Sequence, residues 1–241
     1  MGDWRNERMR QGRRGARNMT KRGAPESGAP APLDVVTAAL VRVAAALAEG
    51  ELGVLQDRLA AARSAGVPDL WVEELLLQSL LVVGYPLTLV AFAAWRELAG
   101  PLPVAGNGEG GGEELAHEEW TSWAKRGAVV CAEVYGRAYH KLLLNLRALH
   151  PALEDLVLVD AYGKLIGRPG LDLKRRELCT VAAIAVLGTA RQLHSHLRGA
   201  LNSGATRAEV EAVLELIDAD LDPAHRRSAR EQWEDVKGRK L

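Results

Sequence analysis

Residues 175–217 have the sequence RRELCTVAAIAVLGTARQLHSHLRGALNSGATRAEVEAVLELI. Apolar side chains recur in it at three- and four-residue spacing, which is typical of amphipathic helices. Gly188 and Gly204 are suited to ending helices. Thr206, with Glu209 three residues later, forms a capping box at which a further helix begins. The pattern therefore predicts three helices joined by tight turns.

The same pattern occurs earlier in the chain. A shift of 138 residues without a gap aligns residues 33–98 with residues 171–236, and about sixteen of the 66 aligned positions are identical. The identities include both helix-ending glycines and Trp95, which aligns with Trp233. Self-similarity of this length indicates an internal duplication. We expect each copy to be a unit of four helices.

The chain as a whole is predicted to be all-α, with two such units joined by a helical insertion. We expect residues 1–32 to form a disordered basic tail, because they are rich in Arg, Gly and Pro. Residues 33–99 form the first unit, 100–114 a Gly-rich linker, and 115–241 the second unit. The insertion, residues 115–165, resembles neither copy.

Glycine and proline clusters mark the expected breaks between helices. Gly84-Tyr85-Pro86 should end the third helix of the first unit at Val83. Gly163 and the triplet Arg168-Pro169-Gly170 should together form a turn that leads into the second unit.

The overall composition excludes several classes of protein. The formal net charge is zero, so nothing overall directs the chain to nucleic acid or to an anionic membrane. The exception is the tail, which is either a basic arm that contacts RNA or phosphate, or a solvated extension with no role. No segment reaches the roughly 18 uninterrupted apolar residues of a membrane span. The two cysteines, Cys131 and Cys179, lie in apolar runs and are expected to be reduced core residues in a cytoplasmic protein.

The two units differ where chemistry would need polar groups. Glu177 and His196 in the second unit align with Ala39 and Arg58 in the first. A tight turn at Gly188 would bring the helices of Glu177 and His196 side by side, and a carboxylate beside an imidazole suits general acid–base catalysis. The alternative is that Glu177 only complements the helix dipole and that His196 is an ordinary half-buried side chain.

Other catalytic motifs find little support. The histidines form no HExxH pattern, and the cysteines lack partners at zinc-ligand spacing. Asp218, Asp220 and Asp222 resemble the start of a calcium loop, but the glycine and the closing glutamate are missing, so we interpret them as an acidic turn. No metal and no cofactor are expected.

Residues 175–217 resemble the most characteristic segment of the carboxymuconolactone decarboxylase / alkylhydroperoxidase D-like family. Two other stretches add to the resemblance: residues 73–98, EELLLQSLLVVGYPLTLVAFAAWREL, and residues 162–173, YGKLIGRPGLDL. The resemblance implies the alkylhydroperoxidase D-like helical fold, here as a tandem copy. It also implies a homo-oligomer, a trimer or a hexamer.

The resemblance also separates two branches of this family. The redox branch carries a Glu, then a C-x-x-C pair, then a His four residues after the second Cys. Glu177 and His196 keep this spacing, but Thr189 and Gln192 stand at the cysteine positions. Without a thiolate at this place there is no attack on a peroxide. The decarboxylase-like branch is therefore implied, as in the degradation of aromatic compounds.

By that likeness, His196 with Glu177 would protonate the carbanion left when CO₂ leaves a small unsaturated lactone or keto acid. Gln192, Arg191 and Arg198 are the expected substrate-binding residues, with Arg168 a further candidate for holding a carboxylate. Two alternatives stay open at this point: a non-catalytic helical oligomer or small-molecule binder, and a divergent redox protein that lacks the cysteine pair.

Overall fold

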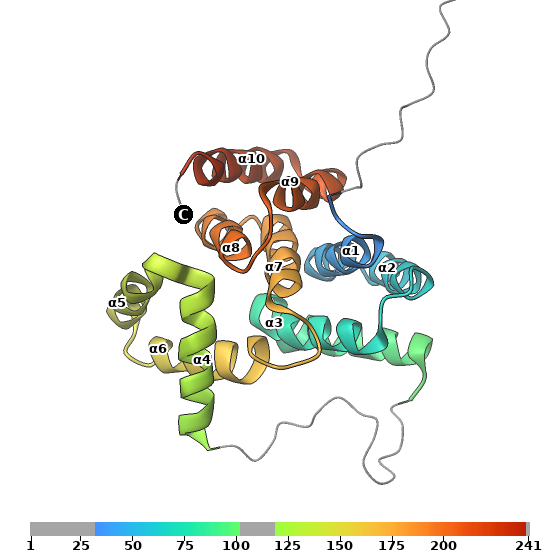
Figure 1. Ribbon diagram of the computed structural model, residues 1–241. Helices are drawn as coiled ribbons and strands as arrows, with labels where there is room; N and C mark the ends of the chain where they lie inside the picture. The colour runs from blue at the N-terminus through green and yellow to red at the C-terminus, as the bar shows by residue number, and fades with distance from the viewer. Residues whose placement is uncertain (1–31, 102–118, 240–241) are drawn as a thin grey trace, which may run out of the picture. The chain divides into compact units, whose positions relative to one another are not determined.

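A computed structural model describes residues 32–101 and 119–239, and within these ranges every regular element is a helix (Figure 1). The all-α prediction is thus confirmed for the described residues. Most of the predicted tail and linker lies outside them. The elements are α1 (Val35–Glu49), α2 (Leu52–Ser64), α3 (Asp69–Ala99), α4 (Trp120–Tyr135), η1 (Gly136–Ala138), α5 (Tyr139–Leu149), α6 (Leu153–Asp155), the π-helix η2 (Leu156–Ile166), α7 (Leu173–Leu187), α8 (Ala190–Asn202), α9 (Arg207–Leu216), η3 (Asp218–Asp220) and α10 (Pro223–Lys237).

The helix boundaries of the two units correspond. α7 begins and ends 138 residues after α1, and α8 does the same relative to α2. α1 is capped by Asp34, whose side chain accepts from the Thr37 amide, and α7 by Asp172, which accepts from the Arg175 amide. Both helices end at a glycine in the left-handed conformation. These caps agree with the proposed repeat, and superposition of the complete units stays a prediction.

The long helix α3 is folded back on itself at Gly84, where φ is 73° and ψ is 177°. In a straight helix, residues 22 positions apart would be separated by about 33 Å. Trp95 Nε1 instead donates to Glu73 Oε1 at 3.4 Å, and Arg96 pairs with the same carboxylate. The predicted break at Gly84-Tyr85-Pro86 is therefore confirmed. The second unit has the matching contact between α9 and α10, from Trp233 Nε1 to Glu211 Oε1, at 3.0 Å.

This fold-back bears on the apolar character of α3. Within the described residues α3 is the one helix long and apolar enough to cross a membrane, with a mean hydropathy of 2.0 in its most apolar window. Each arm of the hairpin has about 15 residues, which makes it about 22 Å long. A bilayer core is about 30 Å thick. Neither arm alone is long enough to span it.

The two units share one hydrophobic core. In Figure 1, α7 lies between α1 and α8, and α1 packs along α7. Small side chains such as Ala44 and Ala182 are fully buried and let these helices approach closely. Larger ones such as Leu40 and Leu178 fill the same cluster. The first unit therefore contributes to the same hydrophobic core as the second and stabilises it.

The expected turn at Gly163 is wrong, because this residue lies inside the π-helix η2. A Cβ atom on Gly163 would lie 2.4 Å from the carbonyl oxygen of Trp123, and one on Gly127 in α4 would lie 1.7 Å from that of Leu158. These two glycines therefore allow α4 and η2 to pack backbone against backbone. The chain turns only after η2, where Gly170 has a φ of 95°.

A buried ion pair connects the two units. Arg176 in α7 has no exposed surface and its Nη2 donates to Glu74 Oε2 in α3 at 2.8 Å. Arg168 binds the same carboxylate at 3.0 Å. Arg176 also donates to Gln78 Oε1 at 3.2 Å. Its remaining bonds go to four backbone carbonyls, those of Leu171, Glu74, Arg168 and Pro169.

We predict that Arg176→Ala lowers the free energy of unfolding by about 3–5 kcal/mol, because the buried Glu74 carboxylate loses one of its two arginine partners and several buried carbonyls lose their donor. Urea denaturation followed by circular dichroism would measure this. The matched control is Arg230→Ala, which removes an arginine that is 69% exposed and pairs with Asp218. That loss should stay within about 1 kcal/mol. Equal losses in both variants would contradict the structural role given to Arg176.

Candidate functional site

A pocket of about 330 Å³ lies where the α3 hairpin, α4, η2, α7 and α8 meet. Its size is at the small end of the range typical of small-molecule sites. The lining residues are Gln78, Leu81 and Val82 from α3, Tyr135 from α4, Val157, Ala161, Tyr162 and Ile166 from η2, Glu177, Thr180, Ile184 and Leu187 from α7, and Thr189, Gln192 and His196 at and within α8.

Glu177 and His196 meet in this pocket, as their spacing predicted. His196 Nδ1 lies 2.9 Å from Glu177 Oε2. The Glu177 side chain is 1% exposed and that of His196 is 17% exposed. The contact exists because Gly188, with a φ of 70°, reverses the chain between α7 and α8. Within the described ranges the other ring nitrogen, Nε2, has no hydrogen-bond partner, so it is the one available to a ligand.

Gly199 makes room for the Glu177 carboxylate. It follows His196 by one helical turn, and a Cβ atom on it would lie 2.5 Å from Glu177 Oε2 and 2.8 Å from Val134 Cγ1. The aligned residue of the first unit is Ala61, in the copy that lacks both the Glu and the His. Comparing the two copies at this position would have identified Gly199 from sequence.

Two tyrosines complete the polar part of the pocket. The rings of Tyr135 and Tyr162 are 6.2 Å apart, and that of Tyr135 lies 6.5 Å from the His196 ring. Burial raises the pKa of Tyr135 to about 12, and the charge of Glu177 acts in the same direction. Burial also raises the pKa of Tyr162 well above its usual range. Both phenols are therefore neutral hydrogen-bond donors at neutral pH. Neither was predicted from sequence: Tyr135 lies in the insertion, and Tyr162 begins the stretch 162–173, which resembles the family but suggested no site role.

The arginines expected to bind substrate lie elsewhere. Gln192 lines the pocket, but neither Arg191 nor Arg198 does. Arg198 is two residues from His196, which places it about 200° around α8. Arg168 is engaged by Glu74. Among the described residues that line the pocket, none is a lysine or an arginine.

Neither cysteine lines the pocket, and neither has the properties of a redox-active thiol. Cys131 and Cys179 are both buried, and burial raises the pKa of each to about 12. Thr189 and Gln192 line the pocket at the positions that a cysteine pair would take. In residues 32–101 and 119–239, no group of three His, Cys, Asp or Glu side chains is placed to hold a metal ion.

The chain was compared with known proteins. Residues 156–235 match the carboxymuconolactone decarboxylase family. The chain is 32% identical over 91 residues to the 4-carboxymuconolactone decarboxylase of Acinetobacter baylyi, a match that covers 37% of this chain and 68% of that protein. This chain belongs to the carboxymuconolactone decarboxylase family.

This chain is also similar to two further proteins. The nitrosuccinic acid decarboxylase npaB of Metarhizium robertsii is 37% identical over 90 residues, which is 36% of this chain. Peroxisomal protein 2 of Schizosaccharomyces pombe is 28% identical over 140 residues, which is 58% of this chain. The chain spans 63% of the length of each of these two proteins.

The match to the carboxymuconolactone decarboxylase family runs from the start of η2 into α10. It includes Tyr162, Glu177, Gln192 and His196. The helix η2, which resembled neither copy at the sequence level, is thus part of the matched segment and also forms one wall of the pocket.

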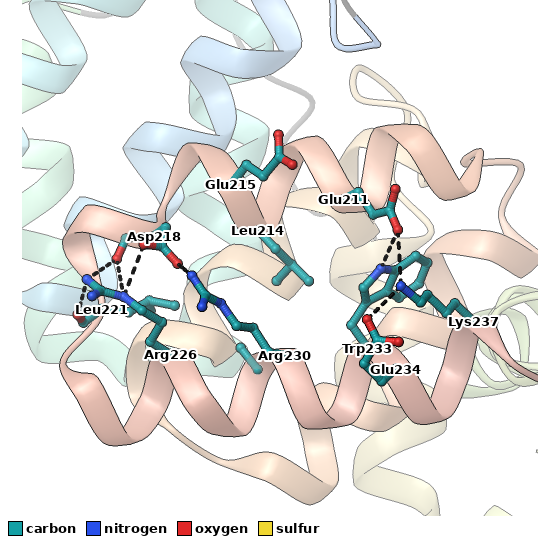
Figure 2. Close-up of a pocket in the computed structure, with 11 residues that line it drawn as sticks. Glu211, Leu214, Glu215, Asp218, Leu221, Arg226, Arg230, Trp233, Glu234 and Lys237 are labelled. Carbon is teal, nitrogen blue, oxygen red and sulfur yellow. Dashed lines mark hydrogen bonds and ion pairs between the residues drawn. The ribbon is translucent and has the colours of Figure 1, made fainter.

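A second hollow, of about 520 Å³, lies between α9 and α10 (Figure 2). Most of its charged side chains pair with one another: Asp218 binds Arg226 and Arg230, and Lys237 binds Glu211 and Glu234. Nearby, Asp222 caps α10 by accepting from two backbone amides. These contacts agree with the interpretation of this region as an acidic turn. The pocket of Glu177 and His196 is the better candidate.

We predict that both thiols are unreactive in the folded protein, because their raised pKa keeps them protonated at any pH well below 12. Ellman's reagent at neutral pH should release almost no thiolate before unfolding and two equivalents after it. Reduction of a hydroperoxide should be undetectable. Peroxide turnover that disappears in Cys179→Ser would count against this prediction.

We also predict that Gly199→Ala separates Glu177 from His196 and lowers the free energy of unfolding by about 1–3 kcal/mol, since the added methyl group overpacks the site. A crystal structure of the variant should show a distance longer than the present 2.9 Å between His196 Nδ1 and Glu177 Oε2. The control is Gly53→Ala in α2, where a Cβ would meet only the end of the Glu51 side chain. An unchanged Glu177–His196 distance in Gly199→Ala would be incompatible with the proposed role of Gly199.

Proposed function

We propose that this chain is a cofactor-free decarboxylase that acts on a small unsaturated lactone or keto acid. The observation that carries the proposal is the buried Glu177 carboxylate held 2.9 Å from His196 Nδ1 in a mostly apolar pocket. The names of two relatives, which are decarboxylases, support the class of reaction.

The proposed reaction needs a proton donor. When the bond between the carboxylate and its carbon breaks, CO₂ leaves and the electron pair stays on that carbon, delocalised into the conjugated carbonyl group. His196 in its imidazolium form donates Nδ1–H to Glu177 and presents Nε2–H to the pocket. Transfer of the Nε2 proton to the carbanion forms the new C–H bond and leaves a neutral imidazole. The ring then takes a proton from solvent.

Glu177 would act through His196. A carboxylate that is 1% exposed stabilises the neighbouring imidazolium more strongly than one in water would, and it fixes the orientation of the ring. Tyr135 and Gln192 line the same pocket, and as neutral donors they would stabilise the carbonyl oxygen that gains charge as CO₂ leaves.

We predict that His196→Ala lowers kcat for decarboxylation by about 10²–10⁴-fold, the usual contribution of a general acid. Glu177→Gln should have a smaller effect, because an amide still orients the ring but cannot stabilise its positive charge. The matched control is His194→Ala. His194 lies on the same helix and also pairs with a carboxylate at 2.9 Å, that of Asp235, but it lies outside the pocket. CO₂ release measured with a coupled assay should be unchanged in this control, and native turnover by His196→Ala would falsify the proposal.

We further propose that the chain assembles as a homo-oligomer, a trimer or a hexamer. Large apolar side chains are exposed around the tip of the α3 hairpin, among them Tyr85 at 69% and Leu89 at 62%. Patches of this kind often mark protein–protein interfaces. Sedimentation velocity at micromolar concentration should show the assembly, and Leu89→Asp should weaken it more than Leu52→Asp, which alters an exposed leucine on α2. A monomeric wild-type protein would rule the proposal out.

A further inference from the structure

The last turn of α4 places Tyr135 beside the proposed general acid. The centroids of the Tyr135 and His196 rings are 6.5 Å apart, and the ring planes are inclined by 66°. Tyr135 is the last residue of α4, whereas His196 lies within α8. The distance between the two rings therefore depends on how the end of α4 is held against α8.

A side-chain hydrogen bond holds that end of α4. Asn202, the last residue of α8, donates from Nδ2 to the carbonyl oxygen of Val134 at 2.8 Å. This carbonyl is among the last four of α4, which a helix leaves without partners of its own. It belongs to the peptide group that joins Val134 to Tyr135. Asn202 thus binds the backbone directly next to the Tyr135 side chain.

Gly136 makes room for this hydrogen bond. Its φ is 51°, a conformation that glycine adopts far more readily than residues with a side chain. A Cβ atom on Gly136 would lie 3.2 Å from Asn202 Nδ2. Glycine at this position therefore allows α4 to end here and allows the Asn202 amide to approach the chain.

The Asn202 hydrogen bond is the second of two points at which α4 is fixed. The first is Gly127, where α4 packs against the backbone of η2. Tyr135 lies about 12 Å further along the helix axis. A small tilt of α4 about Gly127 would therefore displace the Tyr135 ring, and the bond from Asn202 opposes such a tilt.

The first unit lacks this connection. Ser64 aligns with Asn202, and its hydroxyl group donates to the carbonyl oxygen of Ala60 in the same helix at 2.9 Å. The aligned residue thus bonds within α2, whereas Asn202 reaches from α8 to α4. The side chain that reaches a second helix is found in the unit that carries Glu177 and His196.

We propose that Asn202 is a positioning residue, whose hydrogen bond to Val134 keeps Tyr135 beside His196. This inference rests on the proposed decarboxylation, in which Tyr135 would donate to the carbonyl oxygen that gains charge. The benefit of such a donor depends on its placement, and a displacement of about 1 Å can cost about 10²-fold in rate. Asn202 itself does not line the pocket, so it acts through Tyr135.

Kinetics of Asn202 variants test the role in catalysis. Asn202→Ala should lower kcat for CO₂ release by roughly tenfold or more, with little change in KM. Asn202→Asp should do the same, because an ionised carboxylate keeps the shape of the side chain but cannot donate. The matched control is Ser64→Ala, which should leave kcat unchanged. A native kcat in Asn202→Ala would overturn the inference.

A double-mutant cycle distinguishes positioning from a general loosening of the fold. In Tyr135→Phe the hydroxyl donor is already gone, so adding Asn202→Ala should cause no further loss of kcat. If the two losses are additive, Asn202 acts independently of Tyr135 and the inference is wrong.

The His196 ring reports the position of Tyr135 without any substrate. In NMR spectra of the wild-type protein, the Hδ2 and Hε1 protons of His196 experience the ring current of the neighbouring Tyr135. Asn202→Ala should move these signals in the same direction as Tyr135→Leu, which removes the ring. Ser64→Ala should leave them in place. Unmoved signals in Asn202→Ala would also overturn the inference.

The two readouts separate this inference from the proposed function. If the His196 signals move as expected but none of a panel of unsaturated lactone and keto acids releases CO₂, the decarboxylase proposal fails and the placement of Tyr135 by Asn202 stands. If the wild-type protein releases CO₂ but Asn202→Ala keeps both the native signals and the native kcat, the positioning role fails and the decarboxylase proposal stands.

Discussion

The buried pair of Arg176 and Glu74 determines how the two halves of this protein are joined. Residues 102 positions apart meet at 2.8 Å with almost no exposure to solvent, and Arg168 shares the same carboxylate. Loss of Glu74 would leave the buried Arg176 charge without its counterion. The same guanidinium holds Gln78, which lies in the wall of the pocket. The first unit thus contributes Gln78 to the wall of the pocket, although the proposed catalytic residues, Glu177 and His196, both belong to the second unit.

Much of the fold could be predicted because its causes are local in sequence. The caps at Asp34 and Asp172, the left-handed glycine that ends α7 and the capping box at Thr206 each depend on residues within one helical turn. The contact between Glu177 and His196 was predictable for a related reason. A tight turn connects α7 and α8, and it determines which face of each helix lies against the other.

Contacts between distant segments account for what was not predicted. Gly163 looks like a turn residue in sequence, and only its approach to the backbone of Trp123 shows that it serves close helix packing. Tyr162 takes part in the site because η2 packs against α4, a pairing that periodicity does not encode. Arg191 and Arg198 are close to His196 along the chain, but neither lines the pocket, because residues adjacent in sequence point in different directions around α8.

The folded-back helix α3 has a consequence for how the chain must mature. It leaves the ribosome about a hundred residues ahead of Arg176, the partner of its buried Glu74. Translation at about 5–20 residues per second therefore leaves roughly 5–20 s in which α3 has α1 and α2 beside it but still lacks α7 and η2, which also pack on it. During this interval the nascent chain exposes a segment as apolar as a membrane span. Closure at Gly84 needs only residues within α3, so it would let the two arms shield each other before synthesis is complete.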